Sequence, residues 1–154
     1  MRVWVASAND AAEVTRLMVA FRDWWERDVP GDEAAAAGVA RLLTDEGTEF
    51  LLAAAGEGGP VGVCQLRYRY GFWYEAPDCW LEDLFVLEDA RRLGVGRALA
   101  DAALDRARER GCRRIQLDVN EANPEALALY RSLGFDPMQD PPGGTLLLMT
   151  RWLD

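Results

Sequence analysis

The order of apolar and polar residues predicts a strand followed by two helices in the first third of the chain. Residues 3–7 form a short apolar run, which is typical of a buried strand. Residues 14–21 carry apolar side chains at helical spacing, and either Asn9 or Asp10 can cap this helix. After a proline–glycine break, an alanine-rich segment predicts a second helix over residues 32–45.

The rest of the chain alternates between strand and helix patterns. Residues 48–55 and 61–70 flank the turn sequence GEGGP and predict a β-hairpin, and residues 76–86 contain the next strand. A long helix is predicted over residues 95–110, followed by a strand over residues 113–119. The last predicted elements are a helix from Asn123–Pro124 to Gly134, a short strand over residues 135–138, and a strand over residues 145–153.

This order of elements predicts the fold class. A strand, two helices, three strands and then alternating helices and strands favour one mixed, mostly antiparallel sheet with helices on both faces, an α/β (α+β) arrangement. The length of 154 residues, without repeats or a separate linker, predicts a single domain over residues 1–154.

Two residue types are absent, and their absence limits the chemistry. The chain has no histidine, and all 17 basic residues are arginine. This excludes Ser-His and Cys-His triads, the usual zinc sites, Schiff-base lysines and a Walker lysine. Proton transfer must therefore fall to Glu, Asp, Tyr, Cys or water. The cysteines at positions 64, 79 and 112 have neither metal-site nor disulfide spacing, so no metal is expected.

Charge and hydropathy limit the binding partners and the cellular compartment that we expect for this chain. The net charge of −9 disfavours nucleic acid and fits a cationic substrate better. No apolar run approaches the roughly 20 residues that span a bilayer, and the first ten residues lack a signal-peptide pattern. We therefore expect a cytoplasmic protein without membrane contact.

The segment RRLGVGRAL, residues 91–99, places a basic, glycine-containing turn between a strand and a helix. The first N–H groups of a helix have no intrahelical partner, and Gly94 and Gly96 let the backbone approach a ligand. With Arg91, Arg92 and Arg97 nearby, the turn is suited to a phosphate or pyrophosphate. The alternative is a tight turn without a ligand. The turn is neither a Rossmann fingerprint nor a P-loop.

Two segments together resemble the GNAT N-acetyltransferase superfamily. Arg91 to Gly96 match the family's Arg/Gln-x-x-Gly-x-Gly/Ala motif, and NEANPEALALYRSLGF, residues 120–135, matches a second motif. The resemblance covers roughly residues 79–136 and implies acetyl-CoA as the acetyl donor. It implies that the backbone of Leu84, Phe85 and Val86 pairs with the pantetheine arm. It also implies that the N–H groups of residues 92–97, which include Leu93 and Val95, cradle the pyrophosphate.

The second motif supplies a candidate acid. Asn123, Leu127 and Tyr130 lie on one helix face. The resemblance implies that Tyr130 protonates the leaving CoA sulfur and that Asn123 hydrogen-bonds the pantetheine arm. The alternatives are a core aromatic for Tyr130 and an N-cap for Asn123, and both roles of Asn123 can hold at once.

The strand before the turn supplies a candidate base. Strand alternation predicts Trp80, Glu82, Leu84 and Val86 on one face, opposite Asp83. A charge within an apolar strand needs a role or a partner. The strand resembles that of polyamine acetyltransferases, which implies that Glu82 is the base, acting through water. A salt bridge from Glu82 to Arg67 or Arg69 is the alternative, and Asp118 is a weaker candidate for the base.

These observations predict an acetyl-CoA-dependent N-acetyltransferase that acts on a primary amine of a small molecule. A positively charged, polyamine-like acceptor is favoured by the net charge, by Glu82 and Asp83, and by Glu75 and Asp78 in the preceding loop. The alternative is a catalytically silent GNAT-like domain that binds acyl-CoA as a sensor or partner module. Polyamines, amino acids, aminoglycosides and protein N-termini all stay open as acceptors. A homodimer also stays open. Trp73 and Tyr74 can line an acceptor pocket, and an aromatic core or a dimer contact is the alternative.

Overall fold

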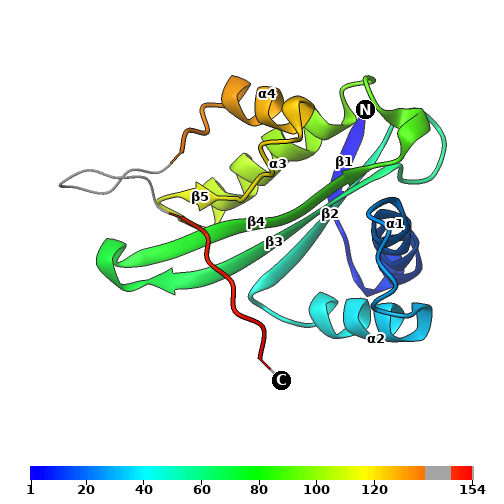
Figure 1. Ribbon diagram of the computed structural model, residues 1–154, viewed down its shortest axis with the longest axis horizontal. Helices are drawn as coiled ribbons and strands as arrows, with labels where there is room; N and C mark the ends of the chain where they lie inside the picture. The colour runs from blue at the N-terminus through cyan, green and yellow to red at the C-terminus, as the bar shows by residue number, and fades with distance from the viewer. Residues whose placement is uncertain (138–146, 154) are drawn as a thin grey trace. The chain divides into compact units, whose positions relative to one another are not determined.

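The computed structural model describes residues 1–137 and 147–153, and these fall into two compact units, residues 1–117 and 118–154 (Figure 1). Each unit is described by itself. The first holds the sheet and three α-helices, and the described residues of the second contain one α-helix.

The first unit is built on a five-stranded mixed sheet in the order β1-β2-β3-β4-β5. The first three pairings are antiparallel, and β4 pairs with β5 in parallel. The strands are β1 (Arg2–Val5), β2 (Thr48–Ala54), β3 (Gly62–Gly71), β4 (Ala76–Val86) and β5 (Ile115–Gln116). The predicted mixed, mostly antiparallel sheet is confirmed. The predicted strand over residues 113–119 shrinks to the two residues of β5.

Helices cover both faces of this sheet, as predicted (Figure 1). On one face lie α1 (Ala11–Trp24) and α2 (Asp32–Leu43), and on the other lies α3 (Val95–Glu109). Every residue of β2 is buried, as expected for a central strand covered from both sides. The core against α1 and α2 consists of Val14, Leu17, Val39, Phe50, Leu52, Val63 and Phe85.

The start of α3 is held close to the sheet by Gly62. A Cβ atom at this position would lie 2.8 Å from Val95 Cγ1 and 3.0 Å from Leu99 Cδ1, which is too close for an ordinary side chain. Gly62 also pairs in register with Val86, the last residue of β4. The first turn of α3 therefore lies close to the end of β4.

The far end of α3 is fixed by an ion-pair network around Glu49 of β2. Arg106 donates to both Glu49 oxygens, at 3.0 and 2.6 Å, and Arg110 Nε donates to Glu49 at 2.9 Å. The Tyr68 hydroxyl also donates to Glu49, at 3.0 Å. Burial raises the pKa of Glu49, but these hydrogen bonds outweigh it and hold the pKa below its usual value. The carboxylate thus stays ionised and ties α3 to the sheet.

The cap of the first helix differs from the prediction. Asp10 is the N-cap residue of α1, but its side chain makes no cap hydrogen bond there. Instead, Ser7 and Asp10 form a reciprocal capping box around the 3-10 turn Ala8–Asp10. The Asp10 carboxylate accepts from the Ser7 N–H at 2.8 Å, and this bond lowers the pKa of Asp10. Asp10 thus occupies the predicted N-cap position, but the side-chain capping bonds belong to the preceding 3-10 turn.

The second unit contains α4 (Pro124–Ser132), which begins where the sequence predicts it. Asn123 caps this helix: its Oδ1 accepts from the Ala126 N–H at 3.1 Å. Residues 135–137 and 147–153 have no regular secondary structure, so the strands predicted there are wrong for these residues. The rest of those two predictions, residue 138 and residues 145–146, lies outside the described residues.

Candidate functional site

The strand that the sequence singles out, β4, carries a β-bulge at Glu82. In the ladder with β3, Asp83 pairs with Gln65 and Leu81 pairs with Leu66, so Glu82 is an extra residue without a register partner. A bulge bends and twists a strand locally and often lies beside a functional site. Glu82 is exposed, whereas Leu81 is buried.

The bulge overturns the predicted alternation of β4. Residues directly opposite each other in a ladder share a face of the sheet. Trp80 pairs with Arg67 and Asp83 pairs with Gln65, two positions apart on β3, so Trp80 and Asp83 share one face. The prediction placed them on opposite faces. The extra residue resets the alternation by one position.

One edge of β4 is open after the bulge. The parallel ladder with β5 consists of Cys79–Ile115 and Trp80–Gln116. Within the described residues it does not continue to Leu84, Phe85 and Val86. Figure 1 shows β4 running well past β5 toward the start of α3. An extended chain can add to such an edge through backbone hydrogen bonds.

The structure tests whether Glu82 forms a salt bridge with Arg67 or Arg69, which was the alternative to its role as a base. Arg67 contacts Asp45, with Nη2 3.7 Å from Oδ2. Among the ion pairs of the described residues, none joins Glu82 to Arg67 or Arg69. The salt bridge considered from the sequence is therefore not formed.

The turn between β4 and α3 has an unusual backbone. Arg92 and Gly94 both adopt the left-handed region, with φ of 65° and 83°. Glycine accepts this conformation readily, but an arginine there is strained. The first described i to i−4 bond of the helix runs from the Ala98 N–H to the Gly94 oxygen, at 3.0 Å. The N–H groups of the three residues before it, Val95, Gly96 and Arg97, lie in the first helical turn, where an anion is favoured.

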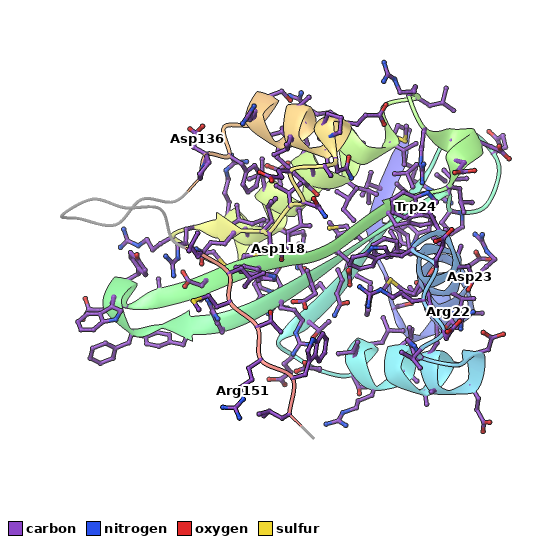
Figure 2. All side chains as sticks on the ribbon, in the orientation of Figure 1. Arg22, Asp23, Trp24, Asp118, Asp136 and Arg151 are labelled. Atoms are coloured by element: carbon purple, nitrogen blue, oxygen red, sulfur yellow. The ribbon has the colours of Figure 1, made fainter. Side chains whose placement is uncertain are left out.

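The predicted arginines of the turn differ in their surroundings. Arg97 lies on α3 and pairs with Asp101, with Nε 3.1 Å from the carboxylate. Arg92 is exposed, as is the neighbouring Leu93. Arg91 is half-buried: its Nε donates to the Val86 oxygen at 3.1 Å, and its guanidinium lies over the Trp24 ring. Figure 2 shows Trp24, at the end of α1, beside the end of β4.

Two of the predicted residues lie in the second unit. Asn123 caps α4, and Tyr130 is buried, with its ring edge-to-face against Phe135 at 5.7 Å. Glu82 and the turn lie in the first unit, so the joint action of Glu82 and Tyr130 stays a prediction. Asp118, the weaker candidate base, is exposed.

Near the β3–β4 connection, Asp78 is buried and paired, whereas Trp73 is exposed. Asp78 is buried and accepts two hydrogen bonds from Arg114, at 3.0 and 2.8 Å, so its charge is already balanced. Arg114 also donates to the Tyr74 hydroxyl at 3.1 Å. Trp73 is 87% exposed, which excludes a core role. Sequence reasoning missed the Asp78–Arg114 pair, for which no local pattern exists.

Two absences among the described residues bear on metal binding and on membrane insertion. Among residues 1–137 and 147–153, no group of three or more His, Cys, Asp or Glu side chains could hold a metal ion. In the same residues, no helix has both the length and the apolar character needed to cross a membrane.

The open edge of β4, the glycine turn and the N-terminus of α3 follow one another and suit an extended ligand that carries an anionic group. The chain matches the model of the acetyltransferase (GNAT) family over residues 14–135. Because this match covers most of its length, the chain belongs to the GNAT acetyltransferase family. It is thus an N-acetyltransferase, and the family uses acetyl-CoA as its co-substrate.

Individual relatives agree with this assignment. An aminoglycoside N(6')-acetyltransferase type 1 from Stenotrophomonas maltophilia is 31% identical over 134 residues, which cover 85% of this chain and 83% of that protein. A mycothiol acetyltransferase from Beutenbergia cavernae is 42% identical over 69 residues, and this stretch spans 43% of this chain and only 23% of that protein. The aminoglycoside N-acetyltransferase AAC(6')-Iy, solved in complex with CoA, has the same fold, with a TM-score of 0.78 at 20% identity over 99% of this chain and 93% of that one.

Proposed function

We propose that the protein transfers the acetyl group of acetyl-CoA directly to a primary amine of a small, positively charged molecule. The observation that carries the proposal is the continuity of the open β4 edge with the glycine turn and the first turn of α3. A thioester with an extended amide arm can pair with such an edge, and its pyrophosphate can then bind at the helix N-terminus. In this proposal, residues 1–154 work as a single domain.

The proposed donor site uses backbone groups on both sides of the turn. The edge of Leu84, Phe85 and Val86 would pair with the amides of the pantetheine arm. The pyrophosphate would be bound by the N–H groups of Arg92, Leu93, Gly94, Val95, Gly96 and Arg97 and by the charges of Arg92 and Arg97. Arg91 would support this turn, because its own N–H already donates to the Glu88 oxygen. In the second unit, Asn123 would hydrogen-bond the arm while it also caps α4.

The proposed chemistry needs two proton transfers. The acceptor nitrogen forms a bond to the thioester carbonyl carbon, and the carbon–sulfur bond breaks. Glu82 takes the proton of the amine, through water, and the Tyr130 hydroxyl supplies a proton to the departing CoA sulfur. The exposed position of Glu82 on the bulge, without an ion pair to Arg67 or Arg69, supports its role as the base.

The acceptor class follows from charge. The chain has a net charge of −9, and Glu82 and Glu75 are exposed. Asp78 no longer contributes to this argument, because Arg114 balances its charge. The similarity to an acetyltransferase of aminoglycosides, which are polycationic amines, also supports a cationic acceptor. We therefore favour polyamine-like or aminoglycoside-like amines over anionic amino acids.

The variant Glu82→Gln tests the proposed base. It removes a charge with almost no change of shape, so we expect a higher acceptor KM and a lower kcat. The loss should shrink as the pH rises, because more acceptor is then already neutral. Glu75→Gln is the matched control, since it removes the same charge from an exposed position outside β4. Its acceptor KM should rise slightly through the lost attraction, whereas kcat and its pH dependence should stay close to wild type. A Glu82→Gln enzyme with wild-type kinetics at every pH would remove Glu82 from the mechanism.

A further inference from the structure

We propose that Arg91 is a positioning residue, which fixes the donor turn by stacking on Trp24 and does not itself contact the donor phosphates. This inference rests on the proposed donor site. It assigns to Trp24, a residue outside the turn and outside β4, an indirect role in donor binding.

The first observation is the set of contacts around the Arg91 guanidinium. Its Nε donates to the Val86 oxygen at 3.1 Å, which closes the connection between the end of β4 and the turn. Its Nη1 lies 3.6 Å from the Glu88 carboxylate. Its Cζ atom lies over the Trp24 ring, 5.0 Å from the ring centre, and over the Phe85 ring at 5.9 Å. The protein thus engages the Nε donor of this guanidinium, pairs its charge with Glu88 and packs it against two aromatic rings.

The second observation is that Trp24 is itself anchored to β4. The Phe85 ring lies 6.2 Å from Trp24 and 5.1 Å from Phe21, and the Phe21 and Phe85 rings are nearly parallel. Arg91, Trp24 and Phe85 therefore contact one another in a closed triangle. Phe85 belongs to β4, Arg91 belongs to the turn after β4, and Trp24 ends α1. The three contacts therefore join these three segments.

The third observation is the strain next to Arg91. Arg92 has a φ of 65°, a strained conformation that a non-glycine residue keeps only when its surroundings enforce it. The stack of Arg91 on Trp24 and its bond to Val86 are local contacts able to enforce it. Without them, the turn is expected to relax from the shape that presents its N–H groups.

Conservative variants separate positioning from direct phosphate contact. Lysine keeps the positive charge but has no planar face to stack on an indole and no Nε in the position of arginine. Arg91→Lys should therefore raise the acetyl-CoA Kd as much as Arg91→Ala does, about 3- to 30-fold for a partly exposed cation–π pair. If Arg91 bound the phosphates, the lysine variant would keep most of the affinity.

Trp24 provides the second test. Trp24→Ala should raise the acetyl-CoA Kd by a factor similar to that of the Arg91 variants, and Trp24→Phe, which keeps an aromatic face, should restore most of the affinity. The double variant Trp24→Ala/Arg91→Ala should bind no more weakly than either single variant, because both remove the same contact. At saturating donor, kcat should stay within about threefold of wild type, since neither residue touches the reacting atoms.

The chain offers a matched control in the same segment. Arg27 lies over the Trp25 ring at 4.8 Å, and Trp25 stacks on Phe21 at 5.5 Å. Trp25 is 55% exposed and Trp24 is 45% exposed, but no described contact joins Trp25 to Phe85 or to Arg91. Trp25→Ala and Arg27→Lys should therefore leave the acetyl-CoA Kd within about twofold of wild type.

Calorimetric titration of acetyl-CoA into the folded variants decides the matter. Equal losses in Arg91→Lys and Trp24→Ala that do not add in the double variant support the positioning role. Wild-type affinity in Trp24→Ala, full rescue by Arg91→Lys, or additive losses would each overturn it. A wild-type protein that binds no acetyl-CoA would instead refute the proposed donor site itself.

Discussion

The proposed pyrophosphate turn can be tested at Gly94, because the structure separates the cost to folding from the cost to binding. Gly94 has a φ of 83°, and a Cβ atom there would meet no heavy atom within 4 Å. Gly94→Val therefore causes no collision within the protein. Its cost to folding is the left-handed backbone alone, about 1–2 kcal/mol, with valine at the upper end because it is β-branched.

Gly111 is the matched control at the opposite end of α3. It has a φ of 73° and likewise no heavy atom within 4 Å of an added Cβ. Gly111→Val should therefore lose a similar 1–2 kcal/mol, and both variants should melt about 2–8 °C below wild type in the absence of ligand.

Acetyl-CoA then separates the two variants. At a hundredfold excess over Kd, the ligand stabilises the wild type by about 2.7 kcal/mol, and Gly111→Val should gain the same amount. Even a tenfold rise in Kd would cut the gain of Gly94→Val to about 1.4 kcal/mol, and we expect a larger rise. Thermal melts with and without acetyl-CoA measure both quantities. An undiminished ligand shift in folded Gly94→Val would refute the turn as the pyrophosphate site.

Three further predictions concern the acid, the buried carboxylate and the thiols. Tyr130→Phe deletes only a hydroxyl, so kcat should fall roughly 10²- to 10⁴-fold while the acetyl-CoA Kd changes little; wild-type turnover would remove Tyr130 from the mechanism. Glu49→Gln should cost about 3 kcal/mol at pH 7, as expected when one partner of a buried ion pair is removed. Because folding lowers the pKa of Glu49, its contribution is present above the unfolded pKa of about 4.3 and is lost as the pH falls through the folded pKa. Chemical denaturation of both proteins between pH 7 and 3 should thus show the gap closing, and a constant gap would contradict the assignment. Burial raises the pKa of all three thiols, that of Cys79 to about 12, but Cys64 and Cys79 are buried whereas Cys112 is partly exposed. At pH 8 a thiol reagent should therefore modify only Cys112 in the folded protein, slowly, and all three cysteines after denaturation.

The sequence predicts the elements whose pattern is local. The hairpin of β2 and β3 and the long helix α3 lie within one or two residues of their predicted bounds. Their signals are an apolar period, a glycine-rich turn and a glycine after the last helical turn, and these depend on neighbouring residues alone. The Asn123 cap of α4 is predicted for the same reason.

The features that the sequence did not reveal depend on distant residues. The bulge at Glu82 exists only relative to the register of β3, so the alternation of β4 by itself gave the wrong faces. The Glu49–Arg106 pair joins residues 57 positions apart, and Asp78–Arg114 joins residues 36 positions apart. Charge counting therefore treated Asp78 as an attractor for the acceptor, although the fold had already neutralised it.

The contact of Arg91 with Trp24 is of the same kind. From the sequence, Arg91 is one of three arginines at a phosphate-type turn, and Trp24 is one of several aromatics at the end of a helix. Only the packing of α1 against β4 brings them together and gives Arg91 a different proposed role from that of Arg92.

The most direct test of the proposed function is amine-dependent release of CoA thiol from acetyl-CoA. The purified protein is incubated with acetyl-CoA and a panel of single amines that includes polyamines, aminoglycosides, neutral amino acid amides and acidic amino acids. Thiol release is followed against time, and the N-acetylated product is identified by mass spectrometry. We predict rapid release with a polycationic amine, with the corresponding acetylamine as product, and little release with acidic amino acids. Donor binding without amine-dependent release across the panel would favour a silent acyl-CoA-binding domain, and an anionic best acceptor would contradict the charge argument.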